Sequence, residues 1–133
     1  MDSLVINASA YTPLVDMNYS SGNILIKGRS IPDQPDEFWL PILSWFESFM
    51  LSNPKQVHIT IDLEYFNISS SKRILFLLYK LNELCDMGVC ATVEWRYRQD
   101  DEDMYEVGQD YAYMVKVPFT FSSYQQQELI EAV

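Results

Sequence analysis

The chain has 133 residues, of which 48% are hydrophobic and 14% aromatic, and its nineteen acidic and nine basic side chains give a net charge of −10. This length suits a single domain over residues 1–133, the apolar content excludes a disordered chain, and no apolar run approaches the ~18 residues of a membrane span. The acidity argues against nucleic acid or an anionic membrane as a partner and favours proteins with a basic face, or it serves solubility alone. Since the first residues lack the basic start of a signal peptide, we expect a cytoplasmic protein.

The first third of the chain predicts short strands and a loop. Residues 4–6 form a short apolar run, and residues 14–18 and 24–28 flank a turn sequence that predicts a hairpin. Gly22 in that turn is free to adopt a positive φ. Residues 28–35 contain two prolines, so we interpret them as a structured loop.

The next segment, residues 38–51, predicts a helix, because its apolar residues recur at spacings of three and four. Pro41 fits such a helix if Leu40 is the cap and Pro41 is the first helical residue. The alternative is a bent helix that begins near Asp36. Asn53 and Pro54 then end the segment.

The clearest strand covers residues 57–63, where apolar and polar side chains alternate. A run of three serines, residues 69–71, can cap a helix whose apolar stripe extends from Ile74 to Cys85 and stops at Gly88. His58 is the only histidine of the chain, so no histidine pair for catalysis or metal binding is available, and its strand position predicts that it is exposed.

The last third predicts a strand at residues 91–97, a short helix at 102–111 and an edge strand at 113–121, because Pro118 cannot donate a hydrogen bond to a central ladder. The tail from Ser122 is polar with a weakly apolar end. Strands that alternate with helices predict an α/β domain with helices packed on a central mixed β-sheet.

The polar turn between the strand at 57–63 and the following helix is the most informative segment. The first amides of a helix lack internal partners and favour negative charge, so a phosphate on Ser69 or Ser70 would be stabilised there, with Lys72 and Arg73 adding positive charge. The alternative is that Ser69 or Ser70 only caps the helix, and the pattern alone favours that alternative.

A family resemblance changes this balance. Residues 65–72, Tyr-Phe-Asn-Ile-Ser-Ser-Ser-Lys, resemble the signature of the SiaC family of bacterial regulatory phosphoproteins. Residues 28–32, 38–45 and 95–104 resemble further family motifs in the same order, and residues 108–111 and 118–119 extend the resemblance over nearly the whole chain. The resemblance implies a fold like the STAS domains of anti-anti-sigma factors.

The resemblance also implies a function. Family members are non-enzymatic switch proteins in cyclic-di-GMP signalling, phosphorylated by a partner kinase and dephosphorylated by a phosphatase. The unphosphorylated form of the best-known type binds and activates a diguanylate cyclase. The resemblance therefore implies protein partners, no catalytic residue, no metal and no cofactor.

One position departs from the family pattern. The family's phosphoacceptor is a threonine directly after the asparagine, and this chain has Ile68 there, which carries no hydroxyl. Either the acceptor has moved to Ser69, with Ser70 as second choice, or the chain is not phosphorylated and stays in one binding state. Asn67, Ile68, Ser71 and Lys72 complete this switch turn, which we define as residues 67–72.

Two other features are candidates for partner binding. Asp100, Asp101, Glu102 and Asp103 form an acidic run that lacks the spaced ligands and glycine of a calcium loop, and such a run is usually a solvated face. The resemblance suggests that this run, and Arg29 in the motif at residues 28–32, face a partner.

Two alternative functions are weaker. A small-molecule or lipid-binding module of the same fold would show a deep apolar pocket, whereas a switch protein would show a filled core and an exposed Ser69. A hydrolase using Ser69 has no pairing base near that residue in sequence.

Overall fold

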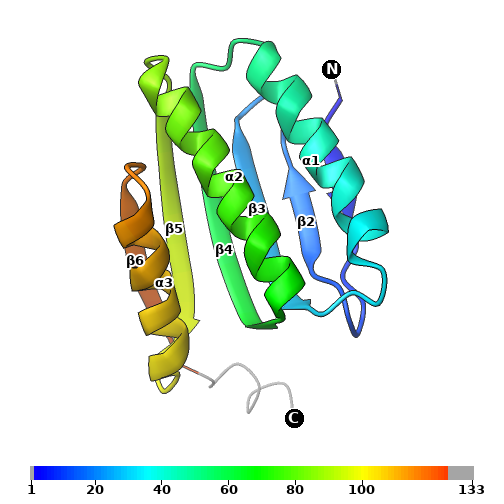
Figure 1. Ribbon diagram of the computed structural model, residues 1–133, viewed down its shortest axis with the longest axis vertical. Helices are drawn as coiled ribbons and strands as arrows, with labels where there is room; N and C mark the ends of the chain where they lie inside the picture. Colours follow the sequence, from blue (N-terminus) through cyan, green and yellow to red (C-terminus); the bar gives the residue numbers. More distant parts are fainter. Residues whose placement is uncertain (1, 126–133) are drawn as a thin grey trace.

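Six strands lie in one sheet in their chain order, β1 to β6, and three helices pack on one face of that sheet (Figure 1). The computed structural model describes residues 2–125. Its elements are β1 (Leu4–Ile6), β2 (Leu14–Met17), β3 (Asn23–Ser30), α1 (Pro35–Leu51), β4 (Gln56–Phe66), α2 (Ile68–Asp86), β5 (Cys90–Arg98), α3 (Glu102–Met114) and β6 (Phe119–Tyr124). The predicted α/β fold with a mixed sheet is confirmed.

The connections explain why the helices share one face. β1, β2 and β3 pair antiparallel, whereas β3, β4, β5 and β6 pair parallel, each joined to the next through one helix. Parallel crossovers have a fixed hand, and each new strand is added on the same side of the last. Every crossover helix therefore falls on the same face.

The core lies between that face and the helices. The inward side chains of β2–β5 pack against the apolar stripes of α1 and α2, which buries four of the α1 aromatic side chains. Leu78 and Trp39 are fully buried. The fully or nearly fully buried strand side chains are Val15, Met17, Ile24, Ile26, Val57, Ile59, Ile61, Leu63, Val93 and Trp95.

The predicted hairpin is confirmed, and Gly22 has a φ of 74°. The Asn18 amide donates to the Asn23 carbonyl across the turn at 2.9 Å. A β-carbon on Gly22 would lie 2.2 Å from the carbonyl oxygen of Gln56, so only glycine fits this position.

Several predicted boundaries are wrong. β3 continues to Ser30 instead of ending at Gly28, because its last residues still pair with β4. α1 begins with Pro35, and Pro41 lies inside it, so Leu40 is not a cap. The start near Asp36 was the better alternative. Burial of apolar side chains on both sides of Pro41 outweighs the backbone hydrogen bond that proline cannot make.

The boundaries near the end of the chain also differ from the prediction. α3 continues to Met114, and β6 covers Phe119–Tyr124, directly after Pro118. The weakly apolar end of the tail, at residues 129–133, lies outside the described residues. His58 is half-buried and not exposed, because its Nδ1 lies 2.6 Å from Thr92 Oγ1 on β5.

A bulge in β4 shapes the end of that strand. Gly28 pairs with Leu63 and Arg29 with Tyr65, so Glu64 has no partner on β3. The extra residue reverses the alternation of side chains. As a result Phe66 packs on the ring of Trp95 inside, while Tyr65 is exposed.

Candidate functional site

The carboxyl ends of the parallel strands bring the predicted site residues to one edge of the sheet. The switch turn follows β4, the acidic run follows β5, and Arg29 is near the end of β3. Figure 1 shows the starts of α2 and α3 together at the lower edge. Open α/β sheets usually carry their sites at this edge.

Asn67 organises the switch turn. It is the N-cap of α2, with φ −89° and ψ 178°, and its Oδ1 accepts hydrogen bonds from the Ser70 amide and the Ser69 hydroxyl, both at 3.0 Å. The backbone N–H of Asn67 donates to the Ser30 carbonyl at 3.1 Å, which fixes the turn to the end of β3. The alternative in which Ser69 or Ser70 caps the helix is therefore wrong.

The three serines of the switch turn have different surroundings. Ser70 is fully buried, and its hydroxyl contacts the Ser30 hydroxyl at 2.6 Å and donates to the Ser30 carbonyl at 3.0 Å. The Ser71 hydroxyl bonds to the hydroxyl of Tyr111. Ser69 is partly buried and not exposed, in contrast to the expectation for a switch protein. Among the contacts of the described residues, its hydroxyl bonds only to the side-chain amide oxygen of Asn67.

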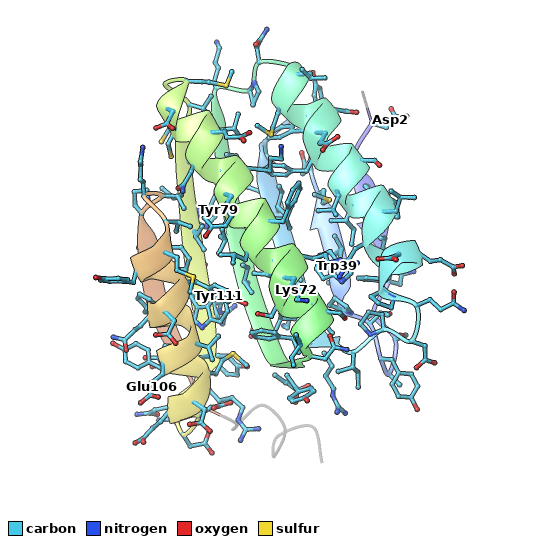
Figure 2. The ribbon with its side chains drawn as sticks, viewed as in Figure 1. Asp2, Trp39, Lys72, Tyr79, Glu106 and Tyr111 are labelled. Carbon is cyan, nitrogen blue, oxygen red and sulfur yellow. The ribbon has the colours of Figure 1, made fainter. Side chains whose placement is uncertain are left out.

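Exposed apolar side chains surround the outside of the turn. Ile68 is 76% exposed and Tyr65 is 53% exposed. Arg29, opposite Tyr65 in the strand register, and Lys72, one helical turn after Ile68, are also exposed. Figure 2 shows Lys72 on the outer side of α2. In a strongly acidic chain, this edge thus combines apolar surface with positive charge.

Arg73 connects the switch turn to α1. One of its guanidinium nitrogens, Nη2, forms an ion pair with Asp36 in the first turn of α1. The other, Nη1, donates to the Ser69 carbonyl at 3.4 Å. A single side chain therefore links the starts of both helices.

α3 is held against the same region by Tyr111 and Trp95. Tyr111 points from α3 toward α2, where its hydroxyl meets Ser71 (Figure 2), and the indole N–H of Trp95 donates to the Met104 carbonyl at 3.0 Å. Burial raises the pKa of Tyr111, and the hydrogen bond with Ser71 offsets part of that rise. Sequence reasoning did not single out Tyr111, although it ends the family-like string at residues 108–111.

The acidic run divides into two parts. Asp100 pairs with Arg98 at 3.2 Å, which lowers the pKa of Asp100 and raises that of Arg98, and Asp101 is the N-cap of α3, accepting from the Met104 amide at 3.0 Å. Glu102 and Asp103 are exposed in the first turn of α3. Two of the four acids thus have structural partners, and two face solvent.

The other face of the sheet carries a polar hollow. It has a volume of about 510 Å³ and is lined largely by polar and charged side chains of β2–β5, including Asp16, His58, Thr60, Glu94 and Arg96. This is not the deep apolar pocket expected for the small-molecule or lipid-binding alternative, so the hollow does not support that alternative. Within residues 2–125, no three histidine, cysteine or acidic side chains converge to hold a metal, and no helix there is long and apolar enough to cross a membrane.

Comparison with protein families gives one match over most of the chain. A sequence model described as "SiaC family regulatory phosphoprotein" matches residues 6–124. An uncharacterized protein of Pseudomonas aeruginosa (strain UCBPP-PA14) is 23% identical over 126 residues, which is 95% of this chain and 100% of that protein.

Solved structures share the fold. Apo-SiaC from Pseudomonas aeruginosa superimposes with a TM-score of 0.85 at 24% identity, covering 92% of this chain and 99% of that one. SiaC in the crystal structure of the diguanylate cyclase SiaD with its activator SiaC, from the same organism, gives a TM-score of 0.88 at 23% identity, covering 91% of this chain and 99% of that one.

Proposed function

This chain belongs to the SiaC family of regulatory phosphoproteins, and we propose that it is a non-enzymatic signalling switch that acts by binding other proteins. The observation that carries the proposal is the switch turn itself. There a partly buried hydroxyl, that of Ser69, lies next to the 76% exposed Ile68 at the start of α2. A hydroxyl that can be modified beside an apolar contact surface is the arrangement a phosphorylation-controlled interface needs.

We propose that the downstream partner is a diguanylate cyclase, because SiaC of Pseudomonas aeruginosa is the activator of such an enzyme. The outer side of α2 supports a protein contact. Phe76 and Tyr79 are 41% and 47% exposed, and their spacing from Ile68 places them on the same outward side of the helix. Large exposed apolar side chains in one row are typical of a protein interface.

Ser69 is the proposed phosphoacceptor, modified by a partner kinase. Its Oγ would bond to the γ-phosphorus of ATP as the bond to ADP breaks, ADP keeping the electron pair and the hydroxyl proton passing to a base of the kinase. A phosphatase would return the hydroxyl by hydrolysis, releasing inorganic phosphate. The burial of Ser70 makes it the poorer acceptor.

Phosphorylation would change the contact surface directly. A phosphoryl group adds a charge of about −1.5 to −2, which the unpaired amides at the start of α2 can receive, but which an apolar partner surface at Ile68 cannot. The fold would therefore tolerate the modification while the interface would not. The hydrolase alternative lacks support, because the Ser69 hydroxyl donates to an amide oxygen, which is no general base.

The test is binding of a co-purified diguanylate cyclase to three variants. Ser69→Asp should weaken binding, and Ser69→Ala should preserve it. Ser48→Asp, the same change at an exposed position of α1, is the matched control and should bind like the unmodified chain. Equal binding by both aspartate variants would contradict the proposal.

Phosphopeptide mapping after incubation with the cognate kinase tests the acceptor itself. Phosphate on Ser69 supports the assignment, and phosphate only outside residues 69–71 refutes it. Absence of phosphate would instead support the alternative in which Ile68 keeps the chain in one permanent binding state.

A further inference from the structure

We propose that Arg73 is the residue that senses the phosphate: a phosphoryl group on Ser69 would take its guanidinium from Asp36 and so release the start of α1 from α2. This inference rests on the proposed function in one respect, the modification of Ser69. It adds a route by which a change on α2 reaches α1.

The geometry places Arg73 within reach of both anions. Arg73 follows Ser69 by four residues, so the two side chains lie on the same side of α2, one turn apart. Its Nη1 already lies 3.4 Å from the Ser69 carbonyl oxygen, while Nη2 pairs with Asp36. Arg73 therefore already contacts both Asp36 and the backbone of the residue that would carry the phosphate.

The balance of the two interactions favours the phosphate. The Asp36 side chain is 91% exposed, and ion pairs of such groups contribute little because water screens them. The Arg73 side chain is only 24% exposed, so its charge is less screened near the turn. A phosphoryl group carries up to about twice the charge of a carboxylate and accepts two parallel hydrogen bonds from a guanidinium.

The exchange also places two negative groups near each other. Once Arg73 binds the phosphate, Asp36 loses its cation and faces the new charge, which repels it. Asp36 is the second residue of α1, directly after the connection from β3, so the start of that helix loses its tie to α2. A partner that contacts both helices would then meet a different surface, including Leu40, which is 65% exposed.

Lys72 is the natural control for charge alone. It is one residue before Arg73, and it is exposed on the outer side of α2 (Figure 2). An ammonium group lacks the planar fork that binds a phosphate through two hydrogen bonds. If only net positive charge mattered, removing Lys72 would act like removing Arg73.

The experiment uses the full chain with phosphoserine incorporated at position 69 during translation, so it needs neither the kinase nor the partner. The phosphate is titrated by phosphorus NMR in three backgrounds: unchanged, Arg73→Gln and Lys72→Gln. We expect a phosphate pKa below the usual value of about 6 in the unchanged chain, a clear rise in Arg73→Gln, and a smaller rise in Lys72→Gln. Equal pKa values in the unchanged and Arg73→Gln chains would overturn the inference.

A second measurement follows the release of Asp36. The side-chain Nε–H resonance of Arg73, assigned by its loss in Arg73→Lys, should shift on Asp36→Asn in the unmodified chain and stay unchanged by Asp36→Asn in the phosphoserine chain. If Asp36→Asn shifts the Arg73 resonance in both the unmodified and the phosphoserine chain, Arg73 does not leave Asp36 for the phosphate, and the inference is overturned. If Arg73 pairs with the phosphate but Ser69→Asp leaves partner binding unchanged, the proposed function is refuted and the role of Arg73 stands. If Ser69→Asp weakens partner binding but Arg73 does not pair with the phosphate, only the role of Arg73 is refuted.

Discussion

The hydroxyl groups of Tyr111 and Ser71 share a hydrogen bond that joins the last turn of α3 to the first turn of α2. The Tyr111 hydroxyl also donates to the Ser71 carbonyl at 3.3 Å, and its ring lies 5.6 Å from that of Trp95 on β5. The switch turn, the central sheet and the helix that begins with the acidic run therefore meet at one tyrosine. Changes in this contact are expected to affect α2 and α3 together.

Tyr111→Phe should lower the free energy of unfolding by about 1 kcal/mol, because the Ser71 hydroxyl loses its partner. The substitution should also change how the stability of the fold depends on pH at alkaline values. Burial raises the pKa of Tyr111, so the folded state favours the neutral phenol, and this stabilisation is present below about pH 10 and is lost as the pH rises through the raised pKa.

Ultraviolet titration and alkaline denaturation test this prediction. The Tyr111→Phe chain should lose one late-titrating tyrosine of the nine and show a weaker loss of stability at high pH. Tyr113→Phe is the matched control, because Tyr113 is 93% exposed, and this variant should keep both the late-titrating tyrosine and the loss of stability at high pH. A late-titrating tyrosine that persists in the Tyr111→Phe chain would show that Tyr111 is not its source.

Gly108→Ala tests the docking of α3 on β5. Helix propensity alone predicts a gain of up to about 1 kcal/mol. A β-carbon at Gly108, however, would lie 2.5 Å from two atoms of the Trp95 indole, which is buried and held by its hydrogen bond to Met104. Overpacking of this kind costs about 1–3 kcal/mol, so we expect a net loss of stability.

Urea denaturation and tryptophan fluorescence measure the effect of Gly108→Ala. Displacement of α3 should expose Trp95 and shift its emission to longer wavelength. Gln109→Ala, at the exposed neighbouring position, should leave both readings unchanged. A chain stabilised by Gly108→Ala would mean that α3 can move away from Trp95 without cost.

Asn67→Ala removes the cap of α2 and should cost about 1 kcal/mol. Asn67→Asp keeps an oxygen that can accept from the Ser70 amide and should retain most of the stability. The midpoints of chemical denaturation of the two variants measure this difference in stability. An equal loss of stability in both variants would contradict capping through Oδ1, because both variants keep the backbone hydrogen bond from residue 67 to Ser30.

The sequence predicted what depends on local pattern. Alternation at residues 57–63 and the apolar stripe of α2 identify a strand and a helix because each pattern reports a single buried face. The bulge at Glu64 depends on the register with β3, which the pattern of one strand does not contain. The choice of Asn67 over three serines as the cap depends on where β4 ends and α2 begins, which the pattern of neither segment specifies alone.

The candidate site was predicted as a segment but not as a set of contacts. Ser69, Ser70 and Ser71 are neighbours of one type in sequence, and only packing against Ser30 and Tyr111 separates them. The link from Arg73 to Asp36 joins residues 37 positions apart, on two helices whose contact no local pattern reveals. The same limit applies to the acidic run, whose four members looked equivalent.

The division of the acidic run gives the last prediction. Glu102→Gln with Asp103→Asn removes two exposed charges that have no capping role, so stability should change little. If the run steers a partner with a basic face, this pair should slow association and reduce its dependence on salt, because clustered charges act on the encounter step.

Asp100→Ala with Asp101→Ala is the matched control, since it removes the same number of charges from the same acidic run. It breaks the pair with Arg98 and removes the cap of α3, so it should reduce stability as well. Stopped-flow association with the identified partner at several salt concentrations, alongside chemical denaturation, separates the two effects. If neither double variant changes the association rate, the acidic run serves only helix capping and solubility. If Glu102→Gln with Asp103→Asn slows association at unchanged stability, these two side chains belong to the partner surface.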